Sequence, residues 1–66
     1  MQENTNRKLL IYNFLNKHNF TKVDFCRIAG INTIALEKFI NCEHYVSLHD
    51  IKKIANVLDV NVLCLL

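Results

Sequence analysis

Apolar residues recur at helical spacing in the first third of the chain. Between Asn6 and Lys17 they occupy positions 10, 11, 14 and 15, so they share one side of a helix, while most polar residues fall on the other side. This pattern predicts an amphipathic helix that ends near residues 18–19. Residues 1–5 carry no such stripe, and we expect them to form a disordered N-terminal tail.

Two capping signals divide the next stretch into a pair of short helices. Thr21 followed by Asp24 combines a side-chain cap with an acid in the first turn, which is typical of a helix start. Gly30 stands where a left-handed residue would end that helix. Asn32 is a second cap, and it opens a predicted helix over residues 33–40.

The last third predicts a loop, a clear amphipathic helix and a short final helix. Residues 41–46 lack periodicity, whereas Ser47 with Asp50 repeats the cap-and-acid signature. Asn61 offers a further cap before Val62–Leu66. The intervening helix has its apolar stripe at Leu48, Ile51, Ile54, Ala55 and Leu58. We therefore predict an all-α fold of five helices, with residues 6–66 forming one domain.

Composition narrows the function classes without choosing one. The chain has 66 residues, 52% of them hydrophobic, and a net charge of +2, which permits a nucleic-acid partner but does not require one. Three cysteines cannot all pair within one chain, and no secretory signal opens it. The apolar runs are too short to span a bilayer. We expect a reduced, cytoplasmic protein with no membrane contact.

The stretch from Lys22 to Lys38 has the features of a helix-turn-helix. Such a motif needs a short helix, a tight turn and a second helix that crosses the first at a steep angle. Cys26 and Ala29 are small enough for a close crossing, and Gly30 can make the turn. The apolar residues that would lock the two helices together are Phe25, Ile31, Leu36 and Phe39.

These residues resemble the lambda-repressor-like (Cro/XRE) helix-turn-helix family over about residues 6–66. The chain departs from the family pattern where Ile40 and Cys42 replace Glu and Gly, Val46 replaces Pro, and Lys22 replaces Gln. The matching residues are Thr21-Lys22, Phe25-Cys26, Ala29-Gly30-Ile31-Asn32, Ser47-Leu48, Ile54-Ala55, Leu58, Val60 and Leu63.

The resemblance implies a compact lambda-repressor-like domain that binds double-stranded DNA sequence-specifically and acts as a transcriptional regulator, which we expect to be a repressor. Helix 33–40 would enter the major groove with its N-terminal end and outward face. Lys38 could donate to guanine or phosphate, and Glu37 could accept from cytosine. The candidate DNA-binding residues are Lys22, Asn32, Thr33, Ile34, Glu37, Lys38 and Asn41.

The roles differ among the remaining candidates. Thr33 and Ile34 could contact a thymine methyl group, while Lys22 and Asn41 are suited to phosphates at the flanks. At every one of these positions a merely solvated helix face is the alternative. Lys52 and Lys53 are expected to be ordinary surface residues.

A protein-interaction module that keeps the fold without DNA binding is the competing hypothesis. Glu37 would repel phosphates, and Ile34 and Ile40 would make the presumed DNA face apolar. The discriminating feature is whether the face that carries Lys22, Thr33, Lys38 and Asn41 is electropositive or apolar.

The C-terminal tail has more apolar residues than one short helix can bury on one face, which predicts a homodimer through residues 60–66. The alternative is an isolated DNA-binding module that needs a partner protein. Cys42, His44 and His49 lack the paired spacing of a zinc site. No nucleophile motif, phosphate loop or paired-carboxylate pocket is visible, so we expect no enzyme activity, no cofactor, no metal and no small-molecule ligand.

Overall fold

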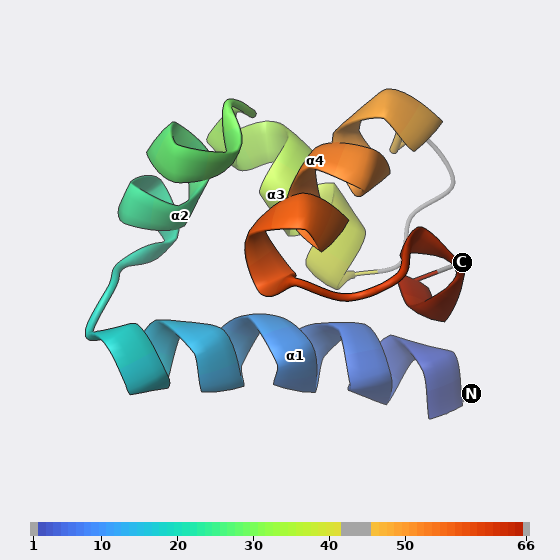
Figure 1. Ribbon diagram of the computed structural model, residues 1–66, viewed down its shortest axis with the longest axis horizontal. Coiled ribbons are helices and arrows are strands. Elements are labelled where there is room, and N and C mark those ends of the chain that lie inside the picture. Colours follow the sequence, from blue (N-terminus) through green and yellow to red (C-terminus); the bar gives the residue numbers. More distant parts are fainter. Residues whose placement is uncertain (1, 42–45, 66) are drawn as a thin grey trace.

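The computed structural model describes residues 2–41 and 46–65, and within them the regular secondary structure is all helical (Figure 1). The elements are four α-helices followed by one 3₁₀-helix, η1. Their bounds are α1 Gln2–His18, α2 Lys22–Ala29, α3 Thr33–Ile40, α4 Leu48–Leu58 and η1 Val62–Leu65. The all-α prediction is confirmed, but the fifth helix is a single 3₁₀ turn rather than an α-helix.

The secondary structure differs from the prediction near both ends of the described chain. The structure places residues 2–5 within α1, which therefore begins at Gln2 rather than Asn6. These residues include neither Gly nor Pro, so nothing in them stops the helix. At the other end, Asn61 Oδ1 accepts a bond of 2.9 Å from the Leu63 amide, and the Asn61 carbonyl accepts one of 2.9 Å from the Cys64 amide. This short-range bonding gives the tighter 3₁₀ winding.

Side-chain caps begin the three central helices, as predicted. The Thr21 hydroxyl accepts from the Asp24 amide at 3.1 Å, and the Asp24 carboxylate accepts from the Thr21 amide at 3.0 Å. Asn32 accepts from the Ala35 amide at 2.8 Å, and Ser47 from the Asp50 amide at 3.1 Å. Each cap satisfies an amide that has no partner within its helix, so the sequence itself fixes where these helices start.

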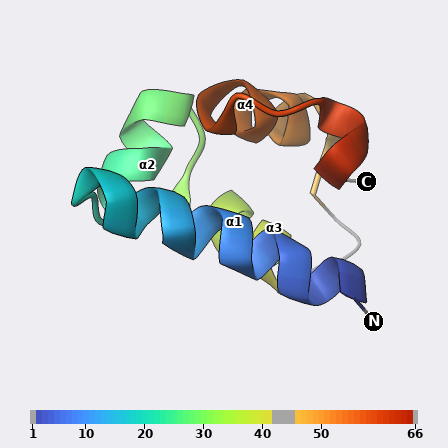
Figure 2. The ribbon, with the colours of Figure 1, turned by 60° about the horizontal axis from the view of Figure 1, so that its bottom comes forward.

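The core lies between α1 and the layer formed by α2, α3 and α4 (Figures 1 and 2). Cys26 and Ala29 are buried, in keeping with their expected place at the α2–α3 crossing. Ile40 is also buried, at 4% exposure, which removes it from the outer face of α3 and corrects its assignment to the presumed DNA face. The largest fully buried side chains are Ile11, Phe25, Leu36, Phe39, Ile54 and Leu65.

Candidate nucleic-acid interface

The turn between α2 and α3 depends on the backbone conformation of Gly30. This residue is left-handed, with φ 77° and ψ 34°, and its amide donates to the Cys26 carbonyl at 2.8 Å. A Cβ placed on Gly30 would meet no heavy atom within 4 Å. Glycine is therefore favoured here by its torsion angle and not by crowding, because L-residues with a side chain adopt positive φ less readily.

Lys53 of α4 supports the same turn. Its Nζ donates to the Gly30 carbonyl at 3.2 Å, although the sequence had suggested an ordinary surface lysine. No sequence signal links two residues that lie 23 positions apart. Lys52, its neighbour, is exposed. Lys53 thus links α4 to the turn that follows α2.

The outer face of α3 carries the side chains that the sequence assigned to DNA contact. Thr33, Ile34 and Glu37 are exposed, with Ile34 at 65%, while Lys38 is half-buried. The opposite face of α3 supplies Leu36, Phe39 and Ile40 to the core. This division into an outer and an inner face is the geometry that a groove-reading helix needs.

Two of the candidate residues bind each other across the motif. Lys22, the first residue of α2, places its Nζ 2.9 Å from Glu37 Oε2 on α3. The same Nζ lies 5.3 Å from the centroid of the Tyr12 ring. The hydrogen bond to Glu37, and next the one to Tyr12, raise the pKa of Lys22 above its ordinary value. The two residues are 15 positions apart, and sequence reasoning missed their pairing.

The pair changes the electrostatics of the surface. It neutralises the one acid on the outer face of α3, which was the main objection to DNA binding. Both side chains remain solvated, at 35% and 50% exposure, so the pair contributes only about 0.2–1 kcal/mol. An interaction this weak can be exchanged for a contact with a phosphate or a base.

Asn32 and Asn41 lie at the two ends of α3. The Asn32 side-chain oxygen already accepts one hydrogen bond as the N-cap, and its amide NH₂ group remains as a donor for a ligand. Asn41 ends the helix through its backbone amide, which donates to the Glu37 carbonyl at 3.0 Å, and its side chain is exposed. Among the described side chains, those of residues 7–41 and 46–65, no carboxylate lies within ion-pair distance of Lys38. Within this described part of the chain, the Lys38 and Asn41 side chains hold no hydrogen bond or ion pair that a DNA contact would have to break.

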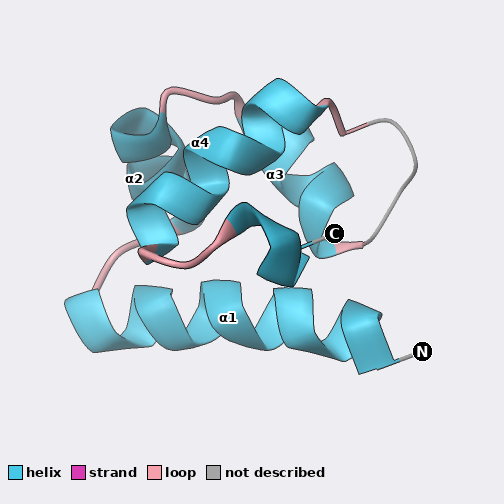
Figure 3. Cartoon of the chain, turned by 45° about the vertical axis from the view of Figure 1, so that its right-hand side comes forward, coloured by secondary structure: helices cyan, strands magenta, loops and turns pink. Residues whose placement is uncertain are grey.

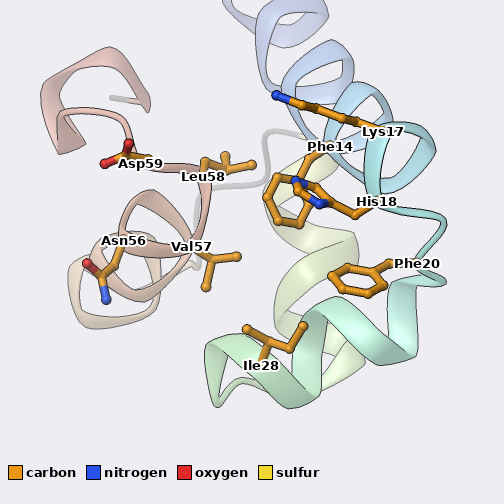
Figure 4. Close-up of a pocket in the computed structure, with 9 residues that line it drawn as sticks. All are labelled: Phe14, Lys17, His18, Phe20, Ile28, Asn56, Val57, Leu58 and Asp59. Atoms are coloured by element: carbon orange, nitrogen blue, oxygen red, sulfur yellow. The ribbon is translucent and has the colours of Figure 1, made fainter.

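A groove of about 700 Å³ opens on the face where α1 and α4 end. Figure 4 shows the rings of Phe14, His18 and Phe20 on one side, with Ile28 below them and Val57 and Leu58 opposite. The His18 and Phe20 rings are stacked with centroids 5.6 Å apart, and Phe14 meets Phe20 at 6.1 Å. Lys17, Asn56 and Asp59 complete the lining.

Two of the three zinc ligands considered from the sequence are not among the described residues. Cys42 and His44 lie outside them, and His49 is exposed on α4. In the part of the chain that is described, no three His, Cys, Asp or Glu side chains gather as a metal site. No described helix is both long and apolar enough to cross a membrane.

Comparison with known proteins agrees with this geometry. The sequence model of the Cro/C1-type helix-turn-helix DNA-binding domain matches residues 11–63, which include the motif, α4 and the first half of η1. No curated protein and no solved structure matches the chain. Since the match spans most of the 66 residues, the chain belongs to the Cro/C1-type helix-turn-helix DNA-binding family.

Proposed function

We propose that this DNA-binding domain is a transcriptional repressor in the cytoplasm that inserts α3 into the major groove of a specific duplex site. The observation that carries the proposal is that the outer face of α3 is exposed to solvent. The helix itself is capped at both ends, and the N-terminus of α2 lies beside it. The free amides at that N-terminus suit a phosphate, and the α3 side chains suit base edges.

The residues divide into positioning and reading roles. Lys22 and Asn41 lie at the flanks of α3, where phosphate contacts fix the register of a recognition helix. Lys38 is the cation available to guanine, while Thr33 and Ile34 suit thymine methyl groups. When a phosphate draws Lys22 away, Glu37 is released as an acceptor for the amino group of cytosine.

Fluorescence anisotropy tests this function. The protein is titrated against a random duplex pool at two salt concentrations, and bound duplexes are recovered and sequenced. We expect a selected sequence and an affinity that falls steeply with salt. Lys38→Ala should weaken binding to the selected duplex by about 1–3 kcal/mol but change binding to scrambled duplexes little. Absence of binding at low salt by the folded protein would reject the proposal.

We further propose that the tail forms a two-fold homodimer interface. In η1, Leu65 is 1% exposed and belongs to the core, whereas Leu63 is 72% exposed and Cys64 is also exposed. Sedimentation equilibrium of Leu63→Asp against wild type tests this surface. Leu48→Asp is the matched control, because Leu48 is 52% exposed on a different helix. A monomeric wild type at high micromolar concentration would refute the dimer.

The groove of Figure 4 favours a second candidate function, the protein-interaction module. Its walls include Ile28, which is 54% exposed, and the aromatic side chains of Phe14 and Phe20. Apolar and aromatic surface of this kind marks many interaction sites. The two functions separate experimentally, because Ile28→Asp should abolish a protein contact at the groove, while Lys38→Ala should leave it intact.

A further inference from the structure

Arg7 makes a set of bonds that neither the motif nor the core requires. From the second turn of α1, its Nε and Nη2 both donate to the Leu65 carbonyl, at 3.0 and 2.7 Å. Its Nη1 donates to the Phe39 carbonyl at 3.4 Å, and its Cζ lies 4.7 Å from the centroid of the Phe39 ring. One side chain thereby contacts the C-terminal ends of two other helices.

Those two ends belong to functionally different elements. Phe39 lies in the last turn of α3, the recognition helix, and Leu65 is the last residue of η1. Carbonyls at a helix C-terminus lack partners within the helix and attract cations, and a planar guanidinium can serve several of them at once. In Figures 1 and 3 the first turns of α1 lie beside η1, which brings Arg7 to this junction.

We propose that Arg7 is a positioning residue that joins η1 to the recognition helix, so that a displacement of η1 changes how α3 is presented to DNA. The proposal rests on the proposed function. It gives the tail a second role, because the exposed residues Leu63 and Cys64 belong to the element that Arg7 holds. Any partner that engages the tail, a second copy included, would then act on DNA affinity through Arg7.

The matched comparison is Arg7→Gln against Lys8→Gln. Both variants lose one positive charge from neighbouring positions of α1, but Lys8 is exposed. Circular dichroism first establishes that both are folded at the assay temperature. For the duplex that wild type selects, Arg7→Gln should lose about 10-fold or more in affinity, and Lys8→Gln about twofold or less. On a scrambled duplex the two variants should bind alike.

The dependence on salt separates positioning from direct phosphate contact. A phosphate ligand would reduce the slope of log affinity against log salt by about 0.9 when it is removed. We expect Arg7→Gln to keep the same slope as Lys8→Gln. A slope reduced only in Arg7→Gln, with equal losses on both duplexes, would overturn the proposal and make Arg7 a phosphate ligand.

A double variant tests the connection to η1. Leu65→Ala weakens the docking of η1. If this substitution acts through Arg7, the factor by which it lowers affinity for the selected duplex should not multiply with the factor for Arg7→Gln. Multiplying losses would refute the connection.

Hydrogen exchange gives a readout that needs no DNA. The last-turn amides of α3 should exchange faster in Arg7→Gln than in Lys8→Gln, with partial recovery in Arg7→Lys. Unchanged exchange in α3 would refute the link. Failure of wild type to select any duplex would refute the proposed function instead.

Discussion

Replacement of Gly30 offers the cleanest measurement of what the helix-turn-helix turn demands of the backbone. In Gly30→Ala, a residue with a side chain would have to adopt φ 77°, which costs about 1–2 kcal/mol for an L-residue. About 0.4–1 kcal/mol of this cost is offset, because alanine lowers the conformational entropy of the unfolded chain relative to glycine. A new Cβ contacts nothing within 4 Å, so no steric contribution adds to the loss. The bond from Lys53 also survives, because it uses the carbonyl of residue 30.

The net expectation is a loss of about 1 kcal/mol in the free energy of unfolding, or about 4–8 °C in Tm for a domain of this size. Gly30→Asn should lose less, because asparagine tolerates this conformation, and Asn19 already adopts φ 59° in this chain. Gly30→Val should lose the most, since a β-branched residue tolerates positive φ least.

Urea unfolding followed by circular dichroism measures the series. The midpoint should shift in the order Gly, Asn, Ala, Val at an unchanged m-value, because the folded state keeps its buried surface. An alanine variant as stable as wild type, or an asparagine variant less stable than alanine, would refute the torsional explanation.

Three further predictions concern charged side chains. The hydrogen bond that the Thr21 backbone amide donates to the Asp24 carboxylate lowers the pKa of Asp24 below its ordinary 3.8. The ionised form of Asp24 therefore stabilises the fold above that pH. This contribution is lost as pH falls through the lowered pKa, and Asp24→Asn should flatten the acid limb of the stability curve measured by thermal unfolding. Glu37→Gln should change stability by about 1 kcal/mol or less while strengthening binding to scrambled duplexes, because it releases Lys22; an unchanged affinity in anisotropy would contradict this. Lys53→Met should cost about 0.5–1 kcal/mol by losing its bond to the turn, whereas Lys52→Met should cost nothing measurable in the same urea titration.

Local chemistry determined the helix starts and the central turn. A capping side chain and its amide are three residues apart, so Thr21, Asn32 and Ser47 could be read directly from the sequence. The single glycine marked the left-handed turn for the same reason. Helical periodicity also separated the inner face of α3, with Leu36 and Phe39, from its exposed outer face.

Contacts between distant residues could not be derived in this way. The burial of Ile40, the Lys22–Glu37 pair and the reach of Arg7 across 58 positions to Leu65 all depend on where separate helices come to rest. The 3₁₀ winding of η1 and the groove at the ends of α1 and α4 also could not be derived from sequence pattern. Sequence pattern specifies interactions within one or two helical turns, whereas the orientation of whole helices follows from packing of the entire core. The sequence by itself therefore determined the central helices and the family motif, and the tertiary structure decided which of their charged side chains are bound to the protein and which remain available to DNA.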